Sequence, residues 1–278
     1  MRSCGLHLFA ILVAAVTFLL VGAGAAVTTS GTGFSIPGWP LFSGKLWPSF
    51  DGPSSYQAAH RLLAGVTGIL TAVLALWVSR TKLPSGVKRT AVAAFLLVVI
   101  QAILGGIEVL NALPRSAGAI HACLAQICLA AVAMVTWSTS SFAHAPLTQV
   151  HDYGWPSLRS LAVVTPLLVF GQILLGALFR HGLLSLIPHL VGAMLTAILV
   201  LMFGIFLMTQ FPQHAVLRGW AMALLTAIFG QLMLGVFTYM NSVSTGEQAV
   251  AGAFTTIVTV AHVAVGGLLF AFSVILGT

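Results

Sequence analysis

Eight long apolar runs, separated by short polar segments, constrain this chain more than any other feature. A helix needs about 20 apolar residues to cross the hydrocarbon core of a bilayer. Runs that meet this length cover roughly residues 6–27, 58–79, 88–110, 117–140, 159–180, 184–209, 216–240 and 253–276. They are too continuous for barrel strands, in which polar and apolar residues alternate. The sequence therefore predicts an all-α integral membrane protein with eight transmembrane helices.

The composition excludes a soluble protein. Hydrophobic residues make up 59% of the 278 residues and charged residues only 5%, whereas soluble domains carry about 25% charged residues. The net charge of +7 does not indicate nucleic acid binding, because no basic run is interleaved with aromatic residues. Cys4, Cys123 and Cys128 lie in apolar stretches without metal-ligand spacing, so we expect no disulfide.

The Lys and Arg residues predict the orientation, because they are enriched on the cytoplasmic side of membrane proteins. With the N-terminus inside, seven of them fall at inner ends and four at outer ends. The inner set is Arg2, Arg80, Lys82, Lys88, Arg89, Arg159 and Arg218, and the outer set is Lys45, Arg61, Arg115 and Arg180. We therefore expect a multi-pass protein of the cell membrane with both termini in the cytoplasm.

The chain contains an internal repeat. The pattern Q-x-x-L-G begins at Gln101, Gln172 and Gln231, each time in an odd-numbered span. Such repetition predicts two pseudo-symmetric four-helix bundles: residues 1–142, a cytoplasmic linker at 143–158, and residues 159–278. Small residues that let helices pack closely would explain the glycines of the pattern but not its glutamines.

His7 only opens the first span, and four of the nine histidines lie deeper within spans: His60, His121, His189 and His262. All four fall in the outer part of an even-numbered span, two in each half. Ionisable groups inside a membrane are costly and usually functional, although any one of them alone could be a hydrogen-bonded packing residue. Two neutral imidazoles that face each other can hold a haem iron from both sides, and bundle cores commonly house such sites. We therefore predict that these four histidines are axial ligands of haem iron, near the outer face.

The first outer segment, residues 28–56, is rich in Gly, Pro and Trp. Loops of this length are usually functional or disordered. Its tryptophans suit the membrane interface, and the functional alternative is a lid over a pocket at the outer face.

The segment from Gly31 to Leu41, GTGFSIPGWPL, followed by His60-Arg61, resembles the heme A synthase family. The eight spans, the two halves, the Q-x-x-L-G repeats and the four histidines resemble it too. The resemblance implies an oxidoreductase that oxidises a ring methyl of heme O to a formyl group with oxygen from water, which gives heme A for terminal oxidases. It also implies that His60 and His121 hold the substrate heme, whereas His189 and His262 hold a heme B cofactor.

The same resemblance implies partners: the enzyme that produces heme O, and an electron acceptor. The resemblance is compatible with both a monomer and an oligomer. Arg61, Arg115 and Arg180 lie on the outer side, where they would pair with haem propionates or anchor the interface.

Two departures from the family pattern stand out. Many members carry a cysteine pair in the first outer loop, and Ile36 and Phe42 stand about where those cysteines would fall, so the chain resembles the type without the pair. The family also tends to carry Glu three residues before the first ligand His, where this chain has Gln57. Gln57 is thus our candidate at the catalytic position. An amide cannot act as a carboxylate base, although it can orient a water molecule.

Two other functions remain open on the sequence. A di-haem membrane cytochrome b with two bis-His sites would only transfer electrons. A non-catalytic relative that binds or delivers haem would fit the missing glutamate. A solute transporter is a more distant alternative, because nothing in the sequence resembles broken helices around an ion site.

Overall fold

The computed structural model describes residues 4–111, 113–144, 154–245 and 252–277. Over these residues the chain forms eight long helices, each long and apolar enough to cross a membrane. They are α1 (Cys4–Thr29), α2 (Ser54–Ser79), α3 (Ser85–Asn111), α4 (Arg115–Thr139), α5 (Leu158–Arg180), α6 (Leu186–Gln210), α7 (Ala215–Thr245) and α8 (Ala253–Leu276). A single 3-10 turn, η1 (Phe142–His144), follows α4. The predicted all-α membrane fold is confirmed.

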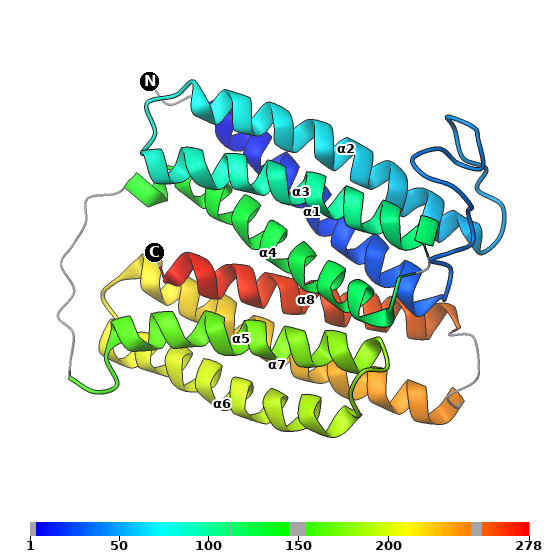
Figure 1. The fold of residues 1–278 in the computed structure, drawn as a ribbon. Coiled ribbons are helices and arrows are strands. Elements are labelled where there is room, and N and C mark those ends of the chain that lie inside the picture. Colours follow the sequence, from blue (N-terminus) through cyan, green and yellow to red (C-terminus); the bar gives the residue numbers. More distant parts are fainter. Residues whose placement is uncertain (1–3, 112, 145–153, 246–251, 278) are drawn as a thin grey trace.

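The helices form two rings of four (Figure 1). In the first ring α1 packs on α2, α2 on α3, α3 on α4, and α4 on α1; α5 to α8 repeat this order. Between the rings α4 packs on α8, α1 on α8, and α4 on α5. Exchanging each helix for its counterpart in the other half maps this set of contacts onto itself, as two pseudo-symmetric bundles require. Most of the predicted linker, residues 145–153, lies outside the described residues.

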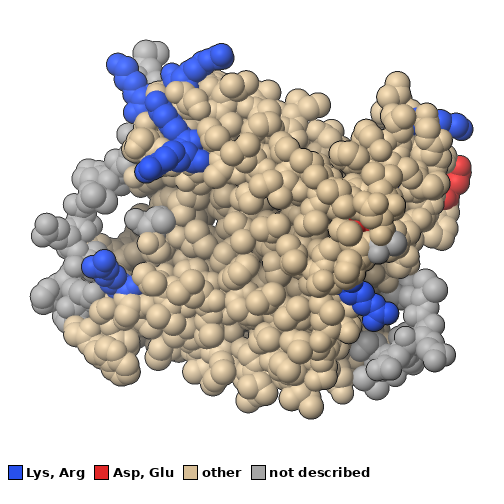
Figure 2. All heavy atoms as spheres, in the orientation of Figure 1, with Lys and Arg blue, Asp and Glu red and all other residues tan. Residues whose placement is uncertain are grey.

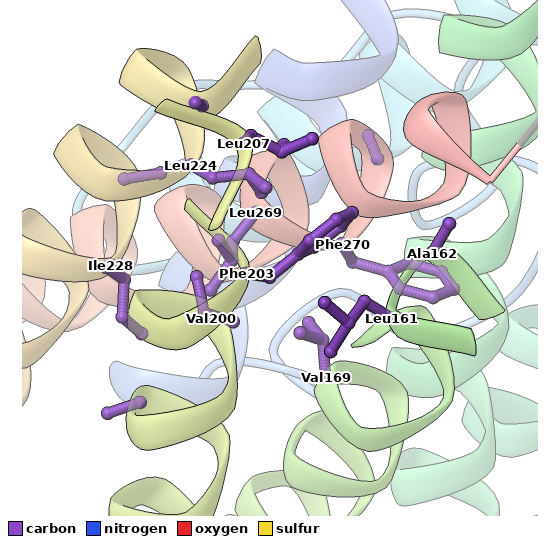
Figure 3. Close-up of a cluster of buried hydrophobic side chains, with 14 of the residues drawn as sticks. Leu161, Ala162, Val169, Val200, Phe203, Leu207, Leu224, Ile228, Leu269 and Phe270 are labelled. Atoms are coloured by element: carbon purple, nitrogen blue, oxygen red, sulfur yellow. The ribbon is translucent and has the colours of Figure 1, made fainter. Parts of the chain in front are cut away.

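Apolar side chains fill each bundle. In the second half Phe203, Leu207 and Leu224 are fully buried, and Phe270 packs beside them (Figure 3). The first half has a separate cluster around Val13, which is also fully buried. Since lipid tails are as apolar as these side chains, close packing rather than water exclusion holds the helices together.

Charged side chains gather at the two ends of the molecule and leave an apolar belt between them (Figure 2). We call the end that carries residues 30–53 the loop end and the opposite one the linker end; α1 begins and α8 ends at the linker end (Figure 1). Six described Lys and Arg residues belong to helix ends or connections at the linker end and four to the loop end. The first set is Arg80, Lys82, Lys88, Arg89, Arg159 and Arg218, and the second is Lys45, Arg61, Arg115 and Arg180.

Candidate functional site

The four predicted histidines form two pairs, one inside each bundle. His60 on α2 faces His121 on α4, with ring centres 6.4 Å apart and ring planes at 70°. His189 on α6 faces His262 on α8, with ring centres 6.3 Å apart and planes at 83°. Over the described part of the chain no group of three or more His, Cys, Asp or Glu side chains could share a metal ion. The arrangement is therefore that of two separate two-ligand sites.

The spacing within each pair fits an iron ion between the rings. An ion bound to one nitrogen of each ring at about 2 Å sets the ring centres roughly 6 Å apart. Buried polar atoms normally have a hydrogen-bond partner, yet Nδ1 of His60, His121 and His262 is buried without one. Two imidazoles that approach from opposite sides and complete no other coordination shell suit a haem, whose macrocycle supplies the remaining four ligands.

A glycine on the preceding helix supports each histidine ring. A Cβ atom at any of these glycines would meet the Cε1 atom of the histidine within 3.3 Å. The pairs are Gly24 with His60 at 3.1 Å, Gly105 with His121 at 3.3 Å, Gly176 with His189 at 2.9 Å, and Gly235 with His262 at 3.2 Å. The last three are the glycines of the Q-x-x-L-G repeats. A Cβ atom at Gly176 would force a shift of His189, and at the other three glycines the imidazole would have to give way by a few tenths of an ångström.

The glutamines of the repeats contact the same histidines. Gln101 Nε2 donates to the His121 carbonyl at 2.9 Å. Gln172 Nε2 donates to the His189 carbonyl at 2.9 Å and lies 3.0 Å from its Nδ1, and Gln231 Nε2 lies 3.4 Å from His262 Nε2. The Gln and Gly of each repeat are four residues apart and so lie on one helix face. Together they contact the histidine of the next helix and fix its position.

Sequence reasoning missed these supporting contacts, although the repeat was the signal for them. The partners are 20, 17 and 31 residues apart, because the connections differ in length. No common spacing therefore links the glutamine to the histidine it holds. In α1 the equivalent position of the glutamine is Leu20, so no side-chain amide contacts His60 there, although the Leu20 backbone does.

The first outer loop is fixed to the start of α2. The Oε1 atom of buried Gln57 accepts from the Ile36 amide at 2.5 Å and the Ser35 hydroxyl at 3.1 Å, and its Nε2 donates to the Gly33 carbonyl. One turn further on, the Arg61 guanidinium donates to the Ile36 carbonyl at 2.8 Å.

Arg61 also bonds to the loop further along. It donates to the Leu41 carbonyl at 3.1 Å and lies 6.0 Å from the centre of the Phe42 ring. Ile36 and Phe42 stand about where many heme A synthases carry a cysteine pair. In this chain all three cysteines are free. Side chains of α2 thus hold the loop at these two positions without a disulfide.

The loop also reaches α3. The indole of Trp39 lies on the Cα face of Gly106, where a Cβ atom would come within 2.5 Å of the ring. Gly106 directly follows Gly105, the glycine that supports His121. The loop therefore runs from the start of α2, next to His60, to the helix that supports His121. The corresponding connection in the second half is short, spanning residues 181–185 between α5 and α6.

A polar cluster lies where the halves meet at the loop end. Glu108 of α3 and His181, which caps α5, both approach Gly118 of α4, where a Cβ atom would meet them at 3.1 and 2.5 Å. Burial and the neighbouring Arg180 guanidinium lower the pKa of His181, so the neutral imidazole is favoured. Arg180 donates to the Ala25 carbonyl of α1 at 2.5 Å and to the Thr29 hydroxyl.

Comparison with known proteins supplies the family. Residues 7–188 match the profile of the COX15-CtaA family, described as cytochrome oxidase assembly protein. This match contains His60 and His121 and ends one residue before His189.

The chain is also similar to individual proteins named heme A synthase. A protein of Symbiobacterium thermophilum named heme A synthase is 32% identical over 177 residues, which cover 60% of this chain and 56% of the relative. A heme A synthase of Geobacillus kaustophilus is 29% identical over 62% of this chain and 55% of its own length. One from Bacillus licheniformis is 31% identical over 44% and 41%, respectively. The chain thus spans about half the length of the curated relatives it matches. With nearly two thirds of its residues in the family match, the chain belongs to the COX15-CtaA family of cytochrome oxidase assembly proteins.

Proposed function

We propose that this protein is a heme A synthase, which oxidises a ring methyl of heme O to the formyl group of heme A. The carrying observation is the pair of facing imidazoles in each bundle, at the spacing that an iron ion requires. Three similar proteins that bear this name support it. In the overall reaction R–CH3 and H2O give R–CHO, four protons and four electrons.

In this proposal the two pairs have different tasks. His60 and His121 bind the substrate heme O, and His189 and His262 bind a heme B cofactor that accepts and passes on electrons. The asymmetry of the connections supports this division. A substrate must enter and leave, and only the first pair has a long loop next to it, whereas a short turn closes the second half.

Gln57 occupies the catalytic position in this proposal, but it acts through the loop. Both polar atoms of its amide already bind loop residues 33–36. A neutral amide with both atoms engaged neither takes a proton nor activates a water molecule. Its role is to hold the loop next to His60, which limits how much bulk water enters the substrate site while leaving room for the water molecule that reacts.

Orientation and partners complete the proposal. The linker end, with six of the ten described Lys and Arg residues, faces the cytoplasm of the cell membrane, and the loop end faces outward. Heme O arrives from the enzyme that produces it, and a membrane electron acceptor removes the electrons.

A di-haem electron-transfer protein is the second candidate. The near identity of the two histidine pairs favours it, since two relay haems would need no difference between their sites. It requires neither a bound loop nor heme O.

Expression in a bacterium whose own heme A synthase gene is deleted separates the two functions. The wild-type chain is expected to restore the visible absorption of heme A in membranes, and His121→Ala is expected to abolish it. A matched control is His214→Ala, which lies at the linker end, away from both pairs. Membranes that accumulate heme B spectra without any heme A would refute the enzyme and favour the cytochrome.

A further inference from the structure

The polar cluster between the halves has no part in haem ligation. It places the His181 imidazole and the Glu108 carboxylate 2.5 and 3.1 Å from the position that a Cβ atom of Gly118 would take. Both side chains are half-buried. Two cations border them: Arg180 precedes His181, and the Arg115 guanidinium lies 3.0 Å from the Cβ position of Gly182.

Glu108 is the only acidic residue within the eight described helices. The chain has four in all: Asp51 is exposed in the first outer loop, and Asp152 and Glu247 lie outside the described residues. A carboxylate inside a membrane helix is costly and is retained for a function. Among the residues that the structure describes, no Lys or Arg forms an ion pair with the Glu108 carboxylate, so ion pairing does not account for this carboxylate.

The position of the cluster relates it to the first histidine pair. Glu108 is three residues after Gly105, which supports His121, and Gly118 is three residues before His121. Both offsets are close to one helical turn, about 5.4 Å, and both lead toward the loop end.

The proposed reaction needs such a group. Four protons must leave the reacting methyl group and water, and Gln57 cannot accept one. We propose that Glu108 and His181 form the proton acceptor of the first half, an inference that rests on the proposed function. In the first oxidation a C–H bond of the methyl group and an O–H bond of the water break and a C–O bond forms. The two electrons leave to a membrane acceptor, by chemical class a quinone, and the proton of the water passes to a Glu108 carboxylate oxygen. Neutral His181 then takes the proton from Glu108 and releases it at the loop end.

The test compares Glu108→Gln and His181→Gln with the matched control Asp51→Asn, which removes the other described carboxylate. The first readout is the midpoint potential of the first-half haem against pH, measured in a His262→Ala background so that one haem reports. With Glu108 and His181 present the potential falls as pH rises, because reduction is coupled to proton uptake. Either test substitution removes this dependence, whereas Asp51→Asn keeps it. Arg115, Arg180 and His121 face the pair and are unchanged in every variant.

The second readout is heme A formed per bound heme O in the otherwise wild-type chain. It is expected to fall at least tenfold in Glu108→Gln, with heme O binding retained, and to recover partly in Glu108→Asp. The proposal is overturned if the midpoint potential does not change with pH while Glu108 and His181 are present. It is also overturned if the potential of Glu108→Gln keeps the same slope against pH. If Glu108→Gln fails to bind heme O, the His181→Gln variant decides. An unchanged slope of its midpoint potential against pH overturns the proposal. A wild-type chain that makes no heme A refutes the proposed function, whereas the pH profiles still decide the role of Glu108.

Discussion

At the scale of single residues, Gln57 shows why side-chain chemistry has to be judged with its contacts. The sequence predicts a neutral group at a position where the family tends to carry an acid. The structure adds that both ends of the amide bind the loop, which needs an acceptor for the Ile36 amide and a donor for the Gly33 carbonyl. The amide of Gln57 offers both, whereas an ionised glutamate at this position would offer only acceptors. No sequence pattern connects Gln57 to residues more than 20 positions earlier in an irregular loop.

Gln57→Glu is therefore expected to loosen the loop while haem binding is retained. The carboxylate still accepts from Ile36, but it loses the donation to Gly33 and repels that carbonyl oxygen. Loss of one hydrogen bond costs about 1 kcal/mol, which raises the open population roughly fivefold. Trypsin cleavage after exposed Lys45, followed by mass spectrometry on the detergent-solubilised protein, measures this opening. Equal cleavage rates in Gln57→Glu and wild type would refute the role of Gln57 in holding the loop.

At the scale of helices, each odd-numbered helix positions the histidine of the next one. The existence, order and approximate bounds of all eight helices follow from the apolar runs alone, because no other structure satisfies such a backbone in lipid. Their lateral packing does not follow from hydropathy, since in lipid every apolar face has an equivalent environment. The Q-x-x-L-G repeat marks the packing faces, because its glycines Gly105, Gly176 and Gly235 lie against the imidazoles. The sequence alone does not show which residue each glycine faces.

Two glycines of α5 allow a matched test of this support. At Gly176 a Cβ atom would lie 2.9 Å from His189, whereas at Gly171 it would meet nothing within 4 Å. Alanine is favoured over glycine in helices by about 1 kcal/mol at either site. Gly176→Ala is nevertheless expected to displace His189 and reduce haem bound in the second half, and Gly171→Ala to leave it intact. Haem content per purified chain, from the absorption spectrum, measures the difference; equal loading would contradict the supporting role.

At the scale of the whole molecule, the two bundles are joined by helix packing and by Arg180. The sequence predicts the two halves but not their contact, because Arg180 and its acceptors on α1 are about 150 residues apart. The last carbonyls of a helix carry partial negative charge, which favours a guanidinium at the end of α1. The same contact places the cation between the halves, next to the cluster of Glu108 and His181.

Arg180→Ala is expected to destabilise the assembled protein. Hydrogen bonds to a charged group contribute about 1.5–3 kcal/mol, and this variant leaves the Ala25 carbonyl without that donor. Arg159→Ala, at the exposed start of the same helix, is the matched control. Thermal unfolding in detergent is expected to begin at a lower temperature for Arg180→Ala alone. Identical transitions in the two variants would show that Arg180 does not join the halves.

The identity of the pigments bound to the purified protein tests the central proposal most directly. Haems are extracted from the wild-type chain, from His60→Ala and from His262→Ala, after expression in a host that makes heme O, and are identified by mass. The account predicts heme B together with heme O, heme A or the hydroxylated intermediate in the wild type. It predicts loss of the heme O-derived species in His60→Ala and of heme B in His262→Ala. Heme B as the sole pigment of the wild-type chain would contradict it.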